Sequence, residues 1–144
     1  MKNKPLIIKG GFFEDTRGRL DFVNDFDLSE IKRMYFTTNS KVDFFRGWQG
    51  HKIESRWFYC VKGKFEVNLV KIDDWQNPSD DLFEITHRLE ASNPQVLYIP
   101  AGYVNGFSAL EKNSKLMILS NFKLGENTND DVRYDSNKWK KKIK

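Results

Sequence analysis

Short segments in which apolar and polar residues alternate recur along the whole chain. In residues 64–70, Phe65, Val67 and Leu69 occupy every second position, so an extended backbone places them on one face. Further segments typical of strands are 5–9, 20–23, 32–38, 56–62, 83–89, 95–100 and 115–122. With about nine or ten short strands, spaced roughly 8–15 residues apart, and no convincing helix, the pattern predicts an all-β sandwich or barrel.

Turn residues mark the connections between these segments. The stretch 15–18, Asp-Thr-Arg-Gly, closes one expected hairpin, and Lys62-Gly63-Lys64 forms the tip of another. Residues 27–31 are interpreted as a single helical turn with Asp27 as its N-cap, too short to be more.

Length and composition fit one globular domain with a β-rich core. A chain of 144 residues is long enough to bury most of its apolar surface as a single domain. Hydrophobic residues make up 39% and aromatic residues 15%, which excludes a disordered chain and favours strands, where aromatic rings pack well. The residues predicted to be largely buried are Phe58, Cys60, Phe65, Val67, Leu69, Tyr98, Phe107 and Leu119.

The C-terminal region divides into a polar arm and a basic tail. Residues 125–137 are expected to form a surface arm that Tyr134 and Trp139 hold against the body. Residues 138–144 contain five lysines, and without them the net charge falls from +4 to about −1. Such a tail could contact nucleic acid or an anionic membrane, but a solvated terminus is the preferred interpretation, so neither partner is predicted.

Two further observations bear on the compartment. No apolar run approaches the roughly 20 residues that span a bilayer, and the N-terminal apolar run is too short for a signal-peptide core. The single cysteine, Cys60, has no partner for an internal disulfide. A cytoplasmic protein is therefore the simplest expectation.

The stretches 45–51 and 98–107 place polar side chains beside aromatic ones. Each is expected to be a short strand that changes direction at glycine. Gln49 and His51 are two residues apart, so on an extended chain both point to the same face, and Asn105 follows a Pro-x-Gly turn. We expect the two stretches to line one cavity around which the rest of the chain builds a wall.

Four motifs in this order resemble the dTDP-4-dehydrorhamnose 3,5-epimerase family of the cupin superfamily and its close cousins, the dTDP-4-keto-6-deoxyglucose 3,4-ketoisomerases. They are Asp15-Thr16-Arg17-Gly18, Arg46-Gly47-Trp48-Gln49, the β run of residues 56–63, and Tyr98 to Phe107 with its Tyr-Ile-Pro start. The resemblance covers roughly residues 5 to 135. It implies a cupin jelly-roll barrel of two antiparallel sheets, and the length and organisation of the chain place one domain over residues 1–137. A homodimer is expected because the family is dimeric and because an N-terminal strand such as Leu6–Lys9 could pair across an edge.

The resemblance also implies roles for several side chains. Arg17 and Arg46 match pyrophosphate-binding arginines, a role that suits the bidentate guanidinium. Arg56 stands where the family has a lysine that steadies a developing enolate. Gln49 and Asn105 stand at histidine positions and are expected to contact substrate by hydrogen bonds.

Departures from the family fall on its acid–base residues. Gln49 replaces the base histidine, and its amide cannot accept a proton. Met117 stands at the position of the tyrosine acid, which leaves it as a substrate contact. The aspartate that orients the base aligns with Ser136, so Asp135 beside it is the candidate for that role.

His51 is the histidine best placed to replace the missing base. It falls on the second histidine of the ketoisomerase motif Gly-x-His-x-His, and imidazole accepts protons near neutral pH. The alternative is a neutral, hydrogen-bonded histidine in the barrel wall. With His51 as base and Arg56 stabilising the enolate, proton transfer at one carbon or a ketoisomerisation is favoured over inversion of two centres.

No metal and no other cofactor is predicted. Many cupins bind metal through three histidines and a glutamate, but Gln49 and Asn105 occupy two of those positions. His51 and Glu54 alone would not hold a transition metal well.

The leading hypothesis is an isomerase that acts on a nucleotide-linked 4-keto-deoxy sugar in the pathway to a surface polysaccharide. Two alternatives stay open. One is a cupin that binds sugar nucleotides or carbohydrate without catalysis, and the other is an interaction domain with a filled barrel.

Overall fold

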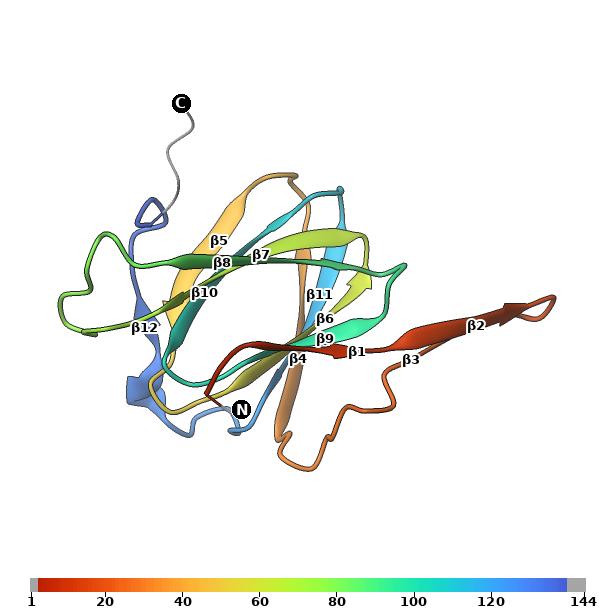
Figure 1. The fold of residues 1–144 in the computed structure, drawn as a ribbon, viewed down its shortest axis with the longest axis horizontal. Coiled ribbons are helices and arrows are strands. Elements are labelled where there is room, and N and C mark those ends of the chain that lie inside the picture. The colour runs from red at the N-terminus through yellow and green to blue at the C-terminus, as the bar shows by residue number, and fades with distance from the viewer. Residues whose placement is uncertain (1–2, 140–144) are drawn as a thin grey trace.

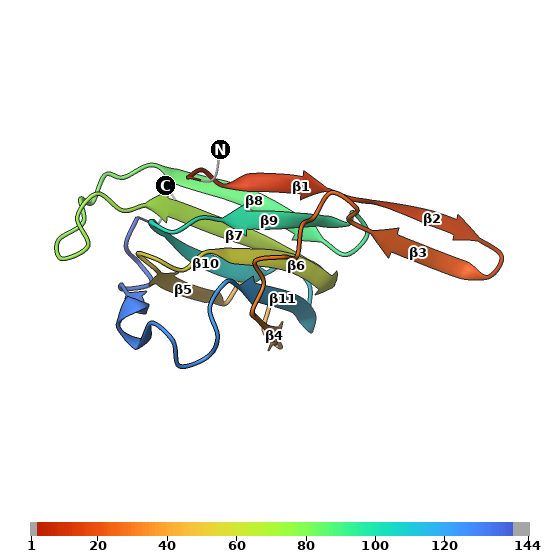
Figure 2. The same ribbon diagram turned by 90° about the horizontal axis from the view of Figure 1, so that it is seen from below.

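The computed structural model describes residues 3–139 and consists almost entirely of antiparallel β-strands. Two five-stranded sheets face each other across a core, as Figures 1 and 2 show. The first sheet has the order β1 (Leu6–Lys9), β9 (Gln95–Ile99), β6 (Arg56–Lys62), β11 (Ser114–Ser120) and β4 (Arg33–Asn39). The second has the order β12 (Val132–Arg133), β5 (Phe45–Gly50), β10 (Tyr103–Ala109), β7 (Lys64–Lys71) and β8 (Glu84–Glu90). The predicted cupin jelly-roll barrel is confirmed.

Side chains from both sheets interdigitate between them, as period-two alternation requires. In β7, Phe65, Val67 and Leu69 are fully buried. The ring of Phe107 lies edge-on to those of Phe58 and Phe65, each with centroids 5.8 Å apart. The predicted core is therefore buried in every case but one.

The exception is Tyr98, which is half-buried on the outer face of the first sheet. It packs there against Trp57, with ring centroids 5.2 Å apart. Residues 23–31 cross this face and cover part of it, with Phe26 packed against Trp57. Tyr98 thus belongs to a second apolar layer outside the barrel.

Residues 27–31, interpreted from the sequence as a helical turn, form a β-turn instead. The Ile31 N–H donates to the Leu28 carbonyl across 3.0 Å, which closes a four-residue turn. Asp27 still acts as a cap, because its carboxylate accepts the Ser29 N–H at 2.9 Å. The only helical segment between residues 3 and 139 is the single 3-10 turn η1 (Thr128–Asp130). No helix in this part of the chain is long and apolar enough to cross a membrane.

The hairpin of β2 (Gly11–Asp15) and β3 (Gly18–Phe22) projects from the barrel body, as Figures 1 and 2 show. Its neighbour in sequence, β1, pairs with β9 of the same chain. The hairpin itself belongs to neither barrel sheet.

The polar arm predicted at residues 125–137 is held on the body by aromatic residues, as expected. Trp48 and Tyr134 exchange backbone hydrogen bonds of 3.3 and 3.1 Å, and the Trp48 indole N–H donates to the Lys138 carbonyl at 2.7 Å. The ring of Trp139 packs edge-on against both Trp48 and Tyr134. Of the predicted basic tail, which begins at residue 138, residues 140–144 lie outside the described residues.

Candidate functional site

A cavity of about 550 Å³ lies between the two sheets, on the side where β4 and β5 face each other. The two stretches singled out from the sequence both line it. Gln49 of β5 and Asn105 of β10 are direct cross-strand partners, and both contribute to the wall. His51, Arg46 and Arg56 line the same cavity, so five of the predicted site residues come together here.

A β-bulge in β5 shapes this wall. Asn105 pairs with Gln49 but Gly106 pairs with Gly47, so Trp48 is the extra residue of β5. The strands approach closely at this point, since a Cβ on Gly47 would lie 2.6 Å from the Gly106 Cα atom. At the bulge Trp48 joins the apolar packing beneath the arm, and both Trp48 and Gln49 line the cavity.

Strand β4 supplies a polar row to the opposite wall. Arg33, Tyr35 and Thr37 line the cavity, whereas Met34 and Phe36 between them are exposed on the outer face. The usual expectation that apolar side chains face the core would predict the reverse orientation of this strand, with Met34 and Phe36 inside the barrel. The inverted pattern is the signal that polar side chains are needed inside the barrel.

His51 is buried and has a defined tautomer. Its Nδ1 atom lies 2.6 Å from the backbone carbonyl oxygen of Asp130, so Nδ1 carries the hydrogen. Its Nε2 atom is buried and has no hydrogen-bond partner among the described residues. Burial, followed by the positive charge of Arg56, lowers the pKa of His51 below its usual 6.5. The imidazole is therefore held neutral, with its basic lone pair on Nε2.

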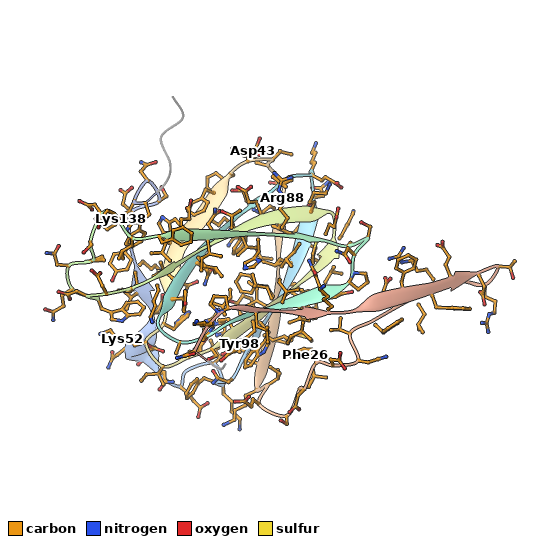
Figure 3. The ribbon with its side chains drawn as sticks, in the orientation of Figure 1. Phe26, Asp43, Lys52, Arg88, Tyr98 and Lys138 are labelled. Atoms are coloured by element: carbon orange, nitrogen blue, oxygen red, sulfur yellow. The ribbon has the colours of Figure 1, made fainter. Side chains whose placement is uncertain are left out.

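The carboxylate of Asp130 fixes the loop that follows His51. It accepts the backbone N–H groups of Lys52 at 2.6 Å, Ile53 at 3.1 Å and Glu54 at 2.9 Å. Figure 3 shows Lys52 close to the arm that carries this aspartate. Asp130 is thus the acidic residue that positions His51, through its main chain and through the loop.

Asp135 does not take the role expected from the sequence. It is exposed, it does not line the cavity, and its carboxylate accepts the N–H of Asn137 at 2.8 Å. The alignment placed the orienting residue too late in the arm, because η1 turns the chain back toward the barrel at Asp130. Asp130, and not Asp135, is therefore the candidate for the acidic residue that orients His51.

Arg56 is buried within the cavity wall and bonded on two sides. Its Nε atom donates to the carboxylate of Glu54, which is also buried, and its Nη1 atom donates to the hydroxyl of Tyr35. Both partners were absent from the predicted site. The guanidinium is held in one orientation next to His51, as a group that stabilises a developing oxyanion must be.

The two arginines assigned to phosphate lie in different places. Arg46 lines the cavity and donates from Nη1 to the hydroxyl of Thr37. Arg17 stands at the tip of the projecting hairpin, where its side chain is 84% exposed and pairs with Asp15 at 2.6 Å. Arg17 therefore does not reach the cavity of its own chain.

Met117 also lies outside the cavity. It packs in the outer layer with Trp57 and Leu119, and the residue of β11 that lines the cavity is Ile118. Alternation along β11 explains the difference, because a shift of one position moves a side chain to the other face. Tyr35 is the direct cross-strand partner of Ile118, so a tyrosine hydroxyl reaches this part of the wall from β4 instead.

Gln49 is bound to the arm. Its amide nitrogen donates to Asp131 at 3.0 Å. Burial raises the pKa of the Asp131 carboxyl, but hydrogen bonds from Arg133 and Gln49 outweigh it and lower the pKa. Asp130 and Asp131 escaped the sequence analysis because the polar composition of residues 125–137 indicated only a surface arm.

In residues 3–139 no group of three or more His, Cys, Asp or Glu side chains could hold a metal ion.

Comparison with known proteins gives these residues a family. The family model described as "FdtA: WxcM-like, C-terminal" matches residues 4–144. The chain belongs to this family. No curated protein sequence matches it.

Solved structures with the same fold include members of both groups that the motifs resemble. A 3,4-ketoisomerase from Helicobacter canadensis shares 23% identity and a TM-score of 0.68, over 90% of each chain. A mutant of the 3,4-ketoisomerase QdtA from Thermoanaerobacterium thermosaccharolyticum, in complex with TDP-4-keto-6-deoxyglucose, shares 24% identity and a TM-score of 0.68, over 93% of this chain and 89% of that one.

A dTDP-4-dehydrorhamnose 3,5-epimerase from Bacillus anthracis, with TDP and PPi bound, has 14% identity and a TM-score of 0.73, over 90% of this chain and 77% of that one. The resemblance inferred from the motifs is confirmed. The barrel of this WxcM-like chain is thus the fold of sugar-nucleotide epimerases and ketoisomerases.

Proposed function

We propose that this chain isomerises a nucleotide-linked 4-keto-deoxy sugar by moving a proton beside the keto group. The observation that carries the proposal is the His51 imidazole, held neutral with Nδ1–H on Asp130 and an unpartnered Nε2, in a cavity that also contains Arg56. Solved structures with the same fold are 3,4-ketoisomerases and a 3,5-epimerase; one of them holds TDP-4-keto-6-deoxyglucose and another holds TDP and PPi.

In this reaction the keto group acidifies the protons on the neighbouring carbons. His51 accepts one of them at Nε2, and the electron pair moves onto the keto oxygen to form an enolate. Arg56 stabilises the negative enolate oxygen. The hydroxyl of Tyr35 accepts a hydrogen bond from Arg56 and can exchange a proton with that enolate oxygen.

Ketoisomerisation suits this arrangement better than inversion at two centres. Returning the proton to the carbon that carried the keto oxygen, with loss of the hydroxyl proton from its neighbour, moves the carbonyl by one carbon. One base on one face suffices for that exchange, whereas two inversions need an acid on the opposite face at each carbon.

A second candidate is binding without catalysis. The observations that favour it are the burial of the His51 Nε2 atom and the presence of Gln49 at the family's base position. In this version the cavity retains the sugar nucleotide through Arg46, Gln49 and Asn105 alone.

Two experiments separate these functions. A thermal-shift screen with TDP-, UDP-, GDP- and CDP-linked sugars tests binding, because a ligand of the native state raises the melting temperature. Incubation of a bound 4-keto-6-deoxy sugar nucleotide in D₂O, followed by NMR, tests catalysis. Deuterium at the carbon beside the keto group supports the isomerase, and tight binding without exchange supports the binding protein.

We also propose that the chain works as a homodimer in the cytoplasm, in the supply of sugars for a surface polysaccharide. Arg17 keeps its phosphate role only if the projecting hairpin reaches the cavity of a second copy. Exposed Phe12, Phe13 and Leu20 on that hairpin support such a contact. Light scattering at micromolar concentration should give twice the chain mass of 17.0 kDa, and a monomer would rule out this role.

A further inference from the structure

Asn105 is a polar residue on the inner face of the barrel, where its neighbours are apolar. Its strand, β10, lies between β5 and β7 in the second sheet (Figure 1). At alternate positions of this strand, Tyr103, Phe107 and Ala109 all belong to the main core. Asn105 is only 5% exposed, and its side chain lines the cavity. Alternation alone would favour an apolar side chain at this position.

The side-chain amide of Asn105 has no hydrogen-bond partner within residues 3–139. The backbone beneath it is fixed on both sides, because Asn105 pairs with Gln49 in β5 and with Leu69 in β7. A buried amide without partners is costly. Its place in a cavity wall therefore points to a ligand that supplies the missing donor and acceptor.

Gln49 presents a second amide next to the first. It lies directly opposite Asn105 in the sheet, and the Cβ atoms of such cross-strand partners are about 4.5–5.5 Å apart. The nitrogen of Gln49 is engaged, because it donates to Asp131 at 3.0 Å, and the oxygen has no partner in the part of the chain that the structure describes. The pair thus offers the Gln49 oxygen as an acceptor and the Asn105 amide as both donor and acceptor.

A ligand with a secondary amide matches these two side chains. An N-acyl amino group has one N–H donor and one carbonyl acceptor in a plane, and it needs one acceptor and one donor in return. The methyl group of an acetyl substituent also has an apolar place, because Phe58, Phe107 and Ile118 line the same cavity. A hydroxyl could bond to both amides but would leave this apolar surface uncovered. A charged substituent would call for an opposite charge, whereas both amides are neutral.

We propose that Asn105 and Gln49 select a sugar that carries an N-acyl amino group at C2. The inference rests on the proposed function and deepens it by naming the substrate class. In a 3,4-ketoisomerisation C1 holds the nucleotide, C3 and C4 exchange the carbonyl, and C5 carries the ring oxygen and C6. C2 is the ring carbon left to carry the group. The substrate is then a nucleotide-linked 2-N-acylamino-4-keto sugar.

The test compares two sugars that differ only at C2. Glucose and N-acetylglucosamine, each linked to TDP and each linked to UDP, are titrated by calorimetry into the parent chain, Asn105→Leu and Asn105→Asp. Contacts to the nucleotide cancel in the ratio of the two affinities. Asn105→Leu removes the amide, and Asn105→Asp keeps its size but loses the N–H donors. The control is Asn24→Leu, because Asn24 is exposed and lines no part of the cavity. Melting temperatures verify that each variant is folded.

We expect the parent to bind N-acetylglucosamine about tenfold or more tightly than glucose on the nucleotide that it accepts, because the acetamido group satisfies both amides. The ratio should fall close to one in both Asn105 variants and stay at the parent value in Asn24→Leu. Equal affinities in the parent, or a ratio that both Asn105 variants keep, would overturn the assignment of C2 alone. Failure of the parent to bind any of the four probes would overturn the proposed function as well.

Discussion

The Nδ1–H of His51 donates a hydrogen bond to the main-chain carbonyl of Asp130 across 2.6 Å. The two residues are 79 positions apart in the chain. This bond selects the tautomer of the imidazole, while the Asp130 carboxylate binds the N–H groups of the loop that follows His51. One residue of the arm thus sets both the orientation and the chemistry of the candidate base.

His51→Asn should abolish deuterium exchange into a 4-keto-6-deoxy sugar nucleotide. General-base catalysis contributes about 10²–10⁴-fold, so the rate should fall by at least about 100-fold while binding persists. NMR of the substrate in D₂O measures the rate. Asp135→Asn is the control, because Asp135 is exposed and outside the cavity, and it should exchange at the parent rate. Unchanged exchange in His51→Asn would exclude this base.

Asp130→Asn should destabilise the fold. An amide oxygen accepts fewer of the three N–H groups, and its NH₂ group meets donors instead, so unfolding free energy should fall by about 1–3 kcal/mol. Urea unfolding measures the change. The same substitution at exposed Asp135 keeps the oxygen that accepts the Asn137 N–H and should cost less than about 0.5 kcal/mol. Equal effects at both sites would contradict the role given to Asp130.

Arg46→Ala should weaken TDP binding. Loss of a charge-assisted contact to phosphate costs about 1.5–3 kcal/mol, which is about tenfold or more in affinity. Calorimetry of the purified variant measures it. Arg17→Ala is informative beside it, since Arg17 lies away from the cavity of its own chain. A loss of TDP affinity in Arg17→Ala, together with a dimer in solution, would show that the hairpin reaches the cavity of a second copy. An unchanged TDP affinity in Arg46→Ala would refute the assignment of Arg46 to phosphate.

Glu54→Ala should be strongly destabilising. It leaves the Arg56 guanidinium buried beside His51 without its carboxylate, and breaking a buried pair in this way costs about 3–5 kcal/mol. The matched variant is Glu90→Ala, which removes the partly exposed partner of Lys64 and should cost about 0–1 kcal/mol. Thermal or urea unfolding of the two variants compares them. A small effect at Glu54 would mean that Arg56 finds another partner.

Stability should fall as the pH drops below about 6.5. Burial lowers the pKa of both His51 and His87, so in this range the unfolded chain takes up protons that the folded chain does not. The contribution of the two histidines to the unfolding free energy is therefore fully present above their usual pKa. It declines as the pH falls from there toward their lowered pKa values. Urea unfolding at pH 7.5, 6.5 and 5.5 should show the decline, and His51→Gln should make it shallower. A slope that His51→Gln leaves unchanged would contradict the lowered pKa of His51.

Local pattern in the sequence was enough for the all-β class and for most strands, but it predicted about nine or ten strands where the described residues form twelve, and it missed β12 inside the polar arm. The family resemblance, and not the pattern, indicated the jelly-roll barrel. Alternation placed Phe65, Val67 and Leu69 on one buried face, and glycine at position 63 marked the hairpin between β6 and β7. The motifs around Arg46 and Tyr98 were enough to indicate the family, because each motif is a contiguous stretch that can be recognised without knowing the fold. The same two stretches were expected to line one cavity, and they do, while the direct pairing of Gln49 with Asn105 came from the structure.

Only the tertiary structure decided which side chains meet. Asp130 reaches His51 from 79 residues away because η1 turns a polar arm back into the barrel, and composition cannot reveal such a return. The face of Met117 depends on a register that shifts along β11, so a one-residue error moved it from the outer layer into the predicted site. Arg17 was assigned by motif, but a hairpin that leaves the body carries it away from the cavity. A sequence fixes local geometry through sterics and alternation, whereas contacts between distant segments depend on the packing of the whole chain.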